Sequence, residues 1–426
     1  VDNAAFAMEQ YGYDTAGRRN FTKQLGGRGD VYNYDSADQV TRVYYDALNP
    51  DTTPSNPQNT VNYVYDKTGN RSRVTVNGTA TRYQANGLNQ YTRIGGAYPT
   101  YDQAGNLTVL GSDQYAYDAQ NRMVSATVGT NMVQSFYDAR NRCVARRNFV
   151  FDPQASVFIQ DYSTCLFYDG WNLIEEVRNN GTPVAYVHGL YTDELVAKIS
   201  TSNTVYYHAD VLGNVTHLTD ESGNVVEQYK YDVFGHPTIL SPVSGVLSSS
   251  AYGNRFLFTG REWLAELGLY DYRNRIYSPM LGRFVQTDPM GFLAGDVNIY
   301  RYCGNNPVDY YDFDGLNKKV IKDVTITHYC NCEKCTGKSL GDKGYGVTSD
   351  GSVAGDGTVA TDWSQIPDGS TVSWTDPQGK KHTGTVQDKG GAIHKNKMDV
   401  WTKDHKTALQ RGRYKADVTV TLPKGK

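Results

Sequence analysis

The chain contains 426 residues, of which 39% are hydrophobic and 20% are charged, and its formal net charge is −3. This length is about two to three times that of a typical domain and suits one large domain and one small one. Because no apolar run reaches the roughly 18 residues of a membrane helix, we expect no membrane span. The chain starts at Val1 without the basic and apolar segments of an export signal, so we expect its natural N-terminus to lie upstream.

The composition changes at residue 316. Of the 34 tyrosines, only Tyr329, Tyr345 and Tyr414 lie beyond it, which leaves 31 in residues 1–316. The later part carries 18 Lys+Arg and 12 Asp+Glu, a charge of +6, and the earlier part carries 24 and 33, a charge of −9. A basic C-terminal part favours an anionic partner such as nucleic acid or a cell-wall polymer. So small an excess of positive charge, however, more often serves solubility alone. Two parts with two roles are therefore predicted.

In residues 1–254 a phrase beginning Tyr-Asp recurs nine times, and four of its eight spacings are 16 to 21 residues. That period suits one β-hairpin per repeat. In each phrase we expect Tyr to end a strand, Asp to make an Asx turn, and a following Gly or Asn to accept a positive φ. Segments between the turns, such as RSRVTVNG, alternate as strands do. The phrases begin at Tyr13, Tyr34, Tyr45, Tyr65, Tyr101, Tyr117, Tyr137, Tyr168 and Tyr231.

These phrases resemble the YD repeats of Rhs proteins and of the C subunit of Tc toxins, over essentially all of residues 1–316. In that family the repeats wind into a hollow shell that holds a toxin. The resemblance implies an all-β fold in which residues 1–254 form a YD-repeat β-hairpin shell, a cocoon or solenoid. A repetitive sheet normally winds or closes to cover its edges, so a solenoid without chemistry is the structural alternative.

Residues 255–316 include the stretch GREWLAELGLYDYRNRIYSPMLGRF and end in YYDFDGL. They resemble the C-terminal signature of the Rhs core, which ends in a second D-P-x-G-L, after which the shell cuts its own chain. The first D-P-x-G element is intact from Asp288, whereas Phe313 replaces the proline of the second. The resemblance implies cleavage between Leu316 and Asn317.

The same resemblance assigns self-cleavage to Asp288 and Asp312, supported by the cation Arg283, with Asp314 as the alternative second acid. Hydrolysis by two aspartates requires one neutral carboxyl that donates a proton and one carboxylate that activates water. Turn formation would also explain aspartates at these positions, and the two roles are compatible.

Residues 317–426 are predicted to form a separate small domain. Alternating stretches such as VTITHYC and ADVTVTL predict a β-barrel, and residues 403–413 predict a short helix. The motifs HYCNCEKCTGK, GVTSDG, GTVATDWSQIPDGSTV and VQDKGGAIHKNKMDVW occur in an order that resembles the three-aspartate (3D) domain of wall-lytic proteins. The order also resembles membrane-bound lytic transglycosylase A, a double-psi β-barrel enzyme. The matching aspartates are Asp362, Asp388 and Asp399.

This resemblance implies cleavage of the β-1,4 bond between N-acetylmuramic acid and N-acetylglucosamine in peptidoglycan. A lytic transglycosylase needs one acid, because the muramic acid C6 hydroxyl closes a 1,6-anhydro ring, whereas ordinary glycosidases use two carboxyls. By resemblance Asp399 is the general acid/base, Asp388 an orienting group and Asp362 a substrate-positioning or structural group. We expect Gly390 and Gly391 to permit a close backbone approach to sugar or to a strand. Aspartates that only hold barrel loops are the structural alternative.

Cys330, Cys332 and Cys335 cluster in the C-terminal part, and three other cysteines are scattered. With His328 the cluster offers four zinc ligands, but C-x-C-x2-C is tight for one tetrahedral ion and lacks a distant second half. A disulfide with one thiol left over, or free thiols, is therefore favoured over zinc, since a periplasm is oxidising. We expect no metal and no cofactor.

Together these features predict a bacterial Rhs-type toxin, secreted by its producer, whose cargo cuts peptidoglycan in the periplasm or wall of a target cell. Such a toxin needs a cognate immunity protein and a delivery apparatus, type VI secretion or a related route. A wall-binding module without catalysis is the first alternative. A nuclease cargo is the second, because of the +6 charge, His394 and Asn396, although no HNH-like spacing accompanies them. No nucleic-acid partner is expected.

Overall fold

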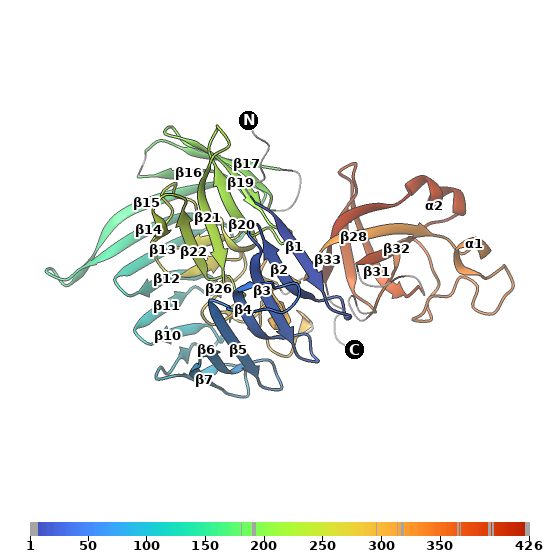
Figure 1. Ribbon diagram of the computed structural model, residues 1–426, viewed down its shortest axis with the longest axis horizontal. Helices are drawn as coiled ribbons and strands as arrows, with labels where there is room; N and C mark the ends of the chain where they lie inside the picture. Colours follow the sequence, from blue (N-terminus) through green and yellow to red (C-terminus); the bar gives the residue numbers. More distant parts are fainter. Residues whose placement is uncertain are drawn as a thin grey trace. The chain divides into compact units, whose positions relative to one another are not determined.

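The computed structural model describes residues 7–179, 181–189, 193–294, 296–312, 314–316, 319–363, 366, 368–390, 393 and 396–421. These residues form mainly β-strands, which confirms the predicted all-β class (Figure 1). Within them, no helix is long and apolar enough to cross a membrane. The chain divides into two compact units, the first comprising residues 1–289, 298–309 and 313–316, and the second residues 290–297, 310–312 and 317–426.

The first unit begins with an eight-stranded antiparallel sheet in which each strand pairs with its neighbour in the sequence. Val40 and Val43 of β4 and Tyr63 of β5 pack together in the core of this sheet. The strands are β1 (Glu9–Tyr13), β2 (Arg19–Gln24), β3 (Arg28–Tyr34), β4 (Val40–Leu48), β5 (Asn59–Tyr65), β6 (Arg71–Val76), β7 (Thr79–Ala85) and β8 (Tyr91–Ile94).

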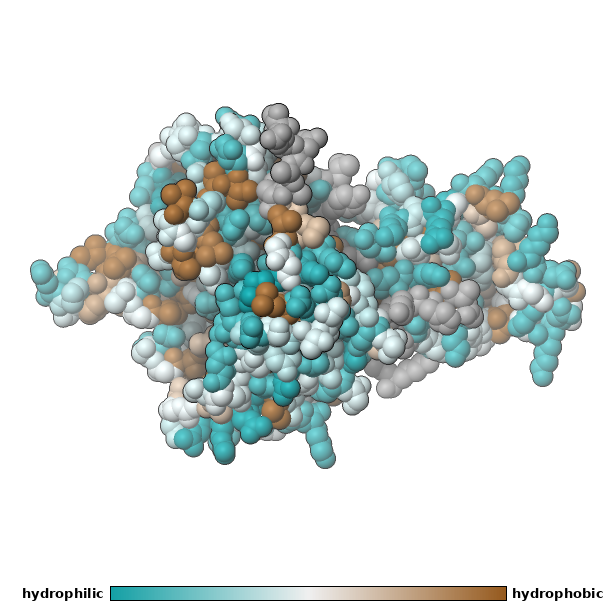
Figure 2. All heavy atoms as spheres, in the orientation of Figure 1, coloured by the Kyte–Doolittle hydropathy of each residue, from teal (hydrophilic) through white to brown (hydrophobic). Residues whose placement is uncertain are grey.

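A second sheet of fifteen strands follows in the same neighbour-to-neighbour order. Its longest hairpin, β14–β15, projects at the left of Figure 1, and Figure 2 shows apolar side chains on it. Val150, Val157 and Ile159 are exposed there. The strands are β9 (Thr100–Tyr101), β10 (Leu107–Leu110), β11 (Asp113–Tyr117), β12 (Met123–Val128), β13 (Asn131–Tyr137), β14 (Cys143–Asp152), β15 (Val157–Asp169), β16 (Asn172–Arg178), β17 (Val184–His188), β18 (Leu195–Ile199), β19 (Thr204–Ala209), β20 (Val215–Thr219), β21 (Val225–Tyr231), β22 (Pro237–Ser241) and β23 (Gly245–Leu247).

At seven of its nine copies the Tyr-Asp phrase makes the Asx turn that the sequence predicts. At Tyr45 and Tyr168 the prediction is wrong, because strands β4 and β15 continue past the tyrosine. Asp66 Oδ1 accepts the backbone N–H groups of Thr68 and Asn70, both at 2.9 Å. The Tyr65 hydroxyl donates to the carbonyl of Val40, the first residue of the preceding strand, at 2.9 Å. The phrase at Tyr65 therefore closes its own turn and ties it to the strand before. The same hydroxyl-to-carbonyl bond recurs at Tyr34, Tyr117, Tyr137, Tyr168 and Tyr231.

Removing one of these hydroxyls is expected to weaken the first unit. Tyr137→Phe deprives the carbonyl of Met123 of the hydroxyl that lies 2.9 Å away, so we expect the free energy of unfolding to fall by about 1 kcal/mol. Urea denaturation followed by circular dichroism measures the change. Tyr13→Phe is the control, because this side chain is 55% exposed and should matter little. Equal losses in the two variants would contradict the stabilising role of the buried hydroxyl.

Residues 255–309 give the first unit a small sheet and an aromatic core. Tyr270, Tyr272, Tyr277, Phe284 and Tyr302 are each 0% exposed, and their neighbouring ring centroids lie 4.5 to 6.4 Å apart. Such a cluster of large rings stabilises the interior strongly. The elements are η1 (Phe258–Gly260), β24 (Glu262–Leu264), β25 (Leu269–Asp271), β26 (Ile276–Ser278), β27 (Arg283–Phe284) and η3 (Cys303–Asn305), while η2 (Gly291–Ala294) falls in the second unit.

This aromatic segment bonds to turns of both large sheets. Arg283 donates to the carbonyl of Asn89 at 2.8 Å and to Oδ1 of Asn70 at 2.7 Å, in turns of the first sheet. The Tyr277 hydroxyl donates to the carbonyl of Phe234, in a turn of the second sheet, at 2.8 Å. The segment therefore links the two rows of hairpins.

The second unit contains a closed barrel with the strand order β28-β32-β29-β31-β30-β33. The pairs β28–β32 and β29–β31 are parallel, so neighbours in the barrel come from distant parts of the sequence. Ile326, Val359, Val386 and Met398 are 0% exposed in its core. The small barrel and the short helix match the sequence prediction. The elements are β28 (Lys319–Tyr329), α1 (Glu333–Thr336), β29 (Thr358–Thr361), β30 (Thr371–Thr375), β31 (Lys381–Asp388), β32 (Lys397–Trp401), α2 (His405–Arg411) and β33 (Tyr414–Thr421).

Candidate functional site

Two of the three predicted barrel aspartates lie at one level of the barrel wall. Strand β29 lies between β31 and β32, and its residue Ala360 pairs with Asp388 on one side and with Asp399 on the other. Directly paired residues of neighbouring strands have adjacent side chains. The fold therefore places Asp388 and Asp399, eleven positions apart in the sequence, in the same register on the two strands that flank β29, with the small residue Ala360 between them, close enough for the charge of Asp388 to act on Asp399.

Asp399 has the properties of a general acid. The pKa of its carboxyl is raised to about 6, mainly by burial and in smaller part by the nearby charge of Asp388, against bonds from Thr327 and Val400 that lower it. Its Oδ1 atom is shielded from solvent and has no hydrogen-bond partner among the described residues. A carboxyl with this pKa carries a proton in a substantial fraction of molecules near neutral pH, as proton donation requires.

Asp388 has the opposite surroundings, because hydrogen-bond donors surround both of its carboxylate oxygens. The backbone N–H and the hydroxyl of Ser349 donate to Oδ1 at 3.0 and 2.7 Å, and the backbone N–H of Lys389 donates to the same atom at 2.9 Å. The Tyr329 hydroxyl donates to Oδ2 at 3.1 Å. Donors of this kind fix the orientation of the carboxyl. The two aspartates are thus suited to different roles.

The other predicted barrel residues are less informative. Asp362 directly follows β29, and its carbonyl accepts the N–H of Ile366 at 2.9 Å; its role at the site stays a prediction. A Cβ atom on Gly390 would meet Cγ1 of Ile393 at 2.7 Å. The backbone of Gly390 therefore lies close to a residue of its own turn. Gly391 and His394 lie outside the described residues.

Sequence reasoning missed the residues that support Asp388. Ser349 lies in the quoted motif GVTSDG and Tyr329 in HYCNCEKCTGK. Trp363 also belongs to this environment, because its Nε1–H donates to the carbonyl of Asp388 at 2.9 Å. The order of the motifs indicated that these segments lie close together. Only the folded barrel shows which of their atoms are in contact.

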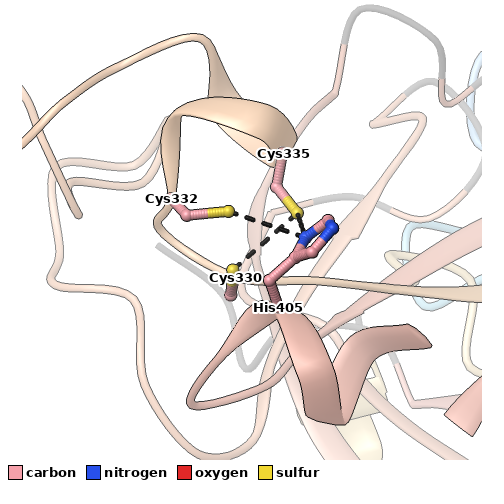
Figure 3. Close-up of side chains that lie close together, drawn as sticks. All are labelled: Cys330, Cys332, Cys335 and His405. Carbon is pink, nitrogen blue, oxygen red and sulfur yellow. Dashed lines mark hydrogen bonds between the residues drawn. The ribbon is translucent and has the colours of Figure 1, made fainter. Parts of the chain in front are cut away.

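The thiol cluster contains a residue that the sequence did not suggest. Cys330, Cys332 and Cys335 are free thiols, and the ligand atoms of these three residues and His405 all lie within 4.8 Å of one another (Figure 3). His328, the histidine considered from the sequence, instead places its Nδ1 atom 3.1 Å from the carbonyl of Gly412. The histidine of this cluster is therefore His405, at the start of α2.

At the proposed self-cleavage site, the cation beside Asp288 is Arg275 and not the predicted Arg283. The side chains of Arg275 and Asp288 are both 0% exposed, and Nη2 of Arg275 lies 3.1 Å from Oδ2 of Asp288. Arg275 Nε donates to the carbonyl of Gly315 at 2.5 Å. One buried guanidinium thus contacts both the predicted acid and the residue before Leu316. Arg283 instead bonds to turns of the first sheet and lies over the ring of Tyr91.

The segment before the predicted scissile bond is firmly held. Asn274 Nδ2 donates to the carbonyl of Asp314 at 2.8 Å. Gly315 has a φ of 70°, and a Cβ atom there would meet the carbonyl oxygen of Tyr272 at 2.7 Å, so only glycine fits. Asp312 is 1% exposed and falls in the second unit, whereas Asp288 falls in the first; their pairing stays a prediction. Phe313 and Asn317 lie outside the described residues.

These features define a β-shell protein that also contains a small barrel domain. The shell consists of neighbour-paired hairpins with an aromatic segment, and the barrel carries two carboxyls in one register. The chain belongs to the Teneurin YD-shell family, whose model matches residues 29–308. The 3D domain model matches residues 357–423, which include Asp362, Asp388 and Asp399. The predicted family relationships are thereby confirmed for both parts.

The similar proteins are much longer than this chain. The tRNA3(Ser)-specific nuclease WapA of Bacillus spizizenii is 29% identical over 268 residues, which are 60% of this chain and 11% of that protein. The double-stranded DNA deaminase toxin A of Burkholderia cenocepacia is 25% identical over 72% of this chain and 24% of its own. A Photorhabdus luminescens Tc holotoxin pore structure has a TM-score of 0.56 at 18% identity, covering 74% of this chain and 17% of that chain. The chain spans a quarter or less of these relatives.

Proposed function

We propose that this chain is part of a bacterial Rhs-type toxin whose shell cuts after Leu316 and frees a peptidoglycan lytic transglycosylase. The observation that carries the enzymatic part is the asymmetry of the two barrel carboxyls. Asp399 is half-buried with a raised pKa, and Asp388, in the same register two strands away, is held by four donated hydrogen bonds. The match of this segment to the 3D domain supports the same assignment.

The chemistry follows from these surroundings. Protonated Asp399 donates its proton to the glycosidic oxygen as the bond to N-acetylglucosamine breaks. The resulting carboxylate then takes the proton of the muramic acid C6 hydroxyl, which attacks the anomeric carbon and closes the 1,6-anhydro ring. The charge of Asp388 is one cause of the raised pKa of Asp399, and the same charge stabilises the oxocarbenium character of the transition state. Purified sacculi should therefore release 1,6-anhydromuropeptides on incubation with the protein.

The pH dependence of this activity provides a separate test. Because burial raises the pKa of Asp399 to about 6, the protonated acid is abundant below that pH and is lost above it. We expect kcat/KM on solubilised glycan strands to fall about tenfold per pH unit well above pH 6. An activity that stays constant from pH 6 to pH 9 would contradict Asp399 as the acid. Circular dichroism at each pH confirms that the fold persists.

The toxin assignment rests on relatives that carry different activities. One similar protein is named as a DNA deaminase toxin and another as a tRNA nuclease. We expect this chain to act likewise as a secreted toxin with a cognate immunity protein in the producer, and to be delivered by type VI secretion or a related route. Its cargo would act in the target periplasm or wall. Protection of cells by a periplasmic partner expressed from the same locus would support this assignment.

Nucleic-acid cleavage is the second candidate, because two relatives are named for acting on nucleic acids. Among the described residues, however, the side chains grouped closely enough to bind a metal are three cysteines and His405. Mg²⁺ prefers carboxylate oxygens, and this group contains none. Degradation of plasmid DNA or tRNA in the presence of Mg²⁺ would favour this candidate. A wall-binding role without catalysis would show as sacculus binding without release of anhydromuropeptides.

A further inference from the structure

Four side chains from two distant segments converge on one point. Cys330, Cys332 and Cys335 come from the loop after β28 and from α1, and His405 begins α2, 70 residues further along the chain. Figure 3 shows the three sulfur atoms and the imidazole directed at one another. The distant second half that the C-x-C-x2-C spacing lacks in the sequence is therefore supplied by the fold.

Three distances within this cluster are close to those of a tetrahedral metal site, and every pair of ligand atoms lies within 4.8 Å. Cys330 Sγ and Cys335 Sγ are 3.8 Å apart, and Nδ1 of His405 lies 3.7 Å from Cys332 Sγ and 3.4 Å from Cys335 Sγ. A tetrahedral zinc ion, with bonds of about 2.3 Å to sulfur and 2.0 Å to nitrogen, would separate two sulfurs by about 3.8 Å and sulfur from nitrogen by about 3.5 Å. A disulfide would require sulfur atoms about 2.05 Å apart.

We propose that Cys330, Cys332, Cys335 and His405 bind one structural Zn²⁺ ion. This site would replace the disulfide or free thiols that the sequence alone favours. Four protein ligands fill the tetrahedron and leave no open position for a water, which is the arrangement of structural and not catalytic zinc sites. On binding, the three thiols release their protons to solvent and the imidazole binds through its neutral Nδ1 atom, so three thiolates and Zn²⁺ leave a net charge of −1.

The local backbone presents the ligands in fixed positions. Cys332 caps α1, and its carbonyl accepts the N–H of Cys335 at 2.9 Å, which fixes the two sulfurs of the C-x2-C turn. Gly337, with a φ of 72°, ends this single turn. On the other side Asp404 caps α2 by accepting the N–H of Thr407 at 2.7 Å, and this bond sets the direction in which the first helical residue, His405, projects.

The proposed ion would also fix part of the candidate active site, a consequence that rests on the proposed function. Cys330 directly follows Tyr329, whose hydroxyl donates to Asp388. The carbonyl of Tyr329 accepts the N–H of Thr402 at 2.7 Å, so the end of β28 is already bound to the segment that leads to α2. A metal joining Cys330 to His405 would lock this connection and hold the Tyr329 hydroxyl against Asp388.

Metal analysis of the intact protein tests the site without any activity measurement. We expect the full chain, purified with reductant and without chelator and then exposed to Zn²⁺ alone, to retain one zinc per chain after gel filtration. Replacement by Co²⁺ should give the intense visible absorption of a tetrahedral cobalt–thiolate centre. Loss of an outer partner of a metal ligand typically weakens binding about 10–100-fold, so Cys335→Ser and His405→Ala should weaken zinc binding by more than about 100-fold.

Two matched variants serve as controls. Cys165→Ser removes an exposed cysteine of the first unit, and His328→Ala removes the histidine that bonds to Gly412. Both should keep one zinc per chain. The proposal is overturned if the unmodified chain retains no zinc while mass spectrometry shows two cysteines of the cluster joined with loss of two hydrogens. Unchanged zinc affinity in His405→Ala would overturn the ligand set. Because these readouts are metal content and absorption, they stand even where sacculi are not digested.

Discussion

Asp399→Asn is expected to lower the release of 1,6-anhydromuropeptides from sacculi by about 10²–10⁴-fold, the usual contribution of a general acid. The amide has nearly the same shape but cannot deliver a proton to the leaving oxygen. The loss should appear in kcat more than in KM, because the group acts in the transition state. The prediction follows from the surroundings of Asp399, because its Oδ1 atom is shielded from solvent and the pKa of its carboxyl is raised to about 6.

Two further variants make this test specific. Asp356→Asn is the matched control, because this aspartate is exposed in the loop before β29, and we expect its activity to be unchanged. Asp388→Asn turns an amide toward the donors of Ser349 and Lys389, so we expect a loss of both activity and thermal stability. If Asp399→Asn keeps the activity of the unmodified protein, the assignment of the acid is wrong.

Asp288→Asn is expected to leave the chain intact, whereas the unmodified protein yields a C-terminal fragment beginning at Asn317. The physical reason is the buried contact of Asp288 with Arg275, which also binds the carbonyl of Gly315, one residue before Leu316. Intact mass and N-terminal sequencing of the fragment check the result directly.

The controls for self-cleavage separate chemistry from folding. Asp38→Asn alters an exposed turn residue with a φ of 60°, a conformation that asparagine accepts readily, and should leave cleavage unchanged. Arg275→Lys keeps the charge but loses the planar fork that reaches both Asp288 and Gly315, so we expect slower cleavage. Appearance of the fragment at the normal rate in Asp288→Asn would exclude this aspartate as the acid.

The hairpin architecture could be predicted because its determinants are local. A Tyr-Asp phrase fixes its own turn within four residues, as the bonds of Asp66 show. Sequence reasoning still undercounted the turns, because Asn86 and Asp210 make the same Asx bonds to residues two and four positions on without a tyrosine before them. The phrase marks most of these turns, but the turn itself needs only the side-chain oxygen.

The pairing of distant residues could not be predicted in the same way. His405 lies too far along the chain from Cys335 for any motif to connect them, and Arg275 lies 40 residues before Gly315. The resemblance to the 3D domain named the aspartates but not the donors on Asp388. Those contacts follow from barrel closure, in which β29 lies between two strands that come later in the sequence.

The strand order implies that the two units fold at different stages of synthesis. In the first unit each strand of the large sheets pairs with the strand just before it, so pairing can advance as the chain leaves the ribosome. In the barrel, β28 pairs with β33, the last strand, and with β32. The barrel therefore cannot close until β33 has been synthesised, by which time the hairpin sheets encoded before it can already have formed. We expect the producing cell to make the cargo in a harmless state until the sheets that precede it are in place.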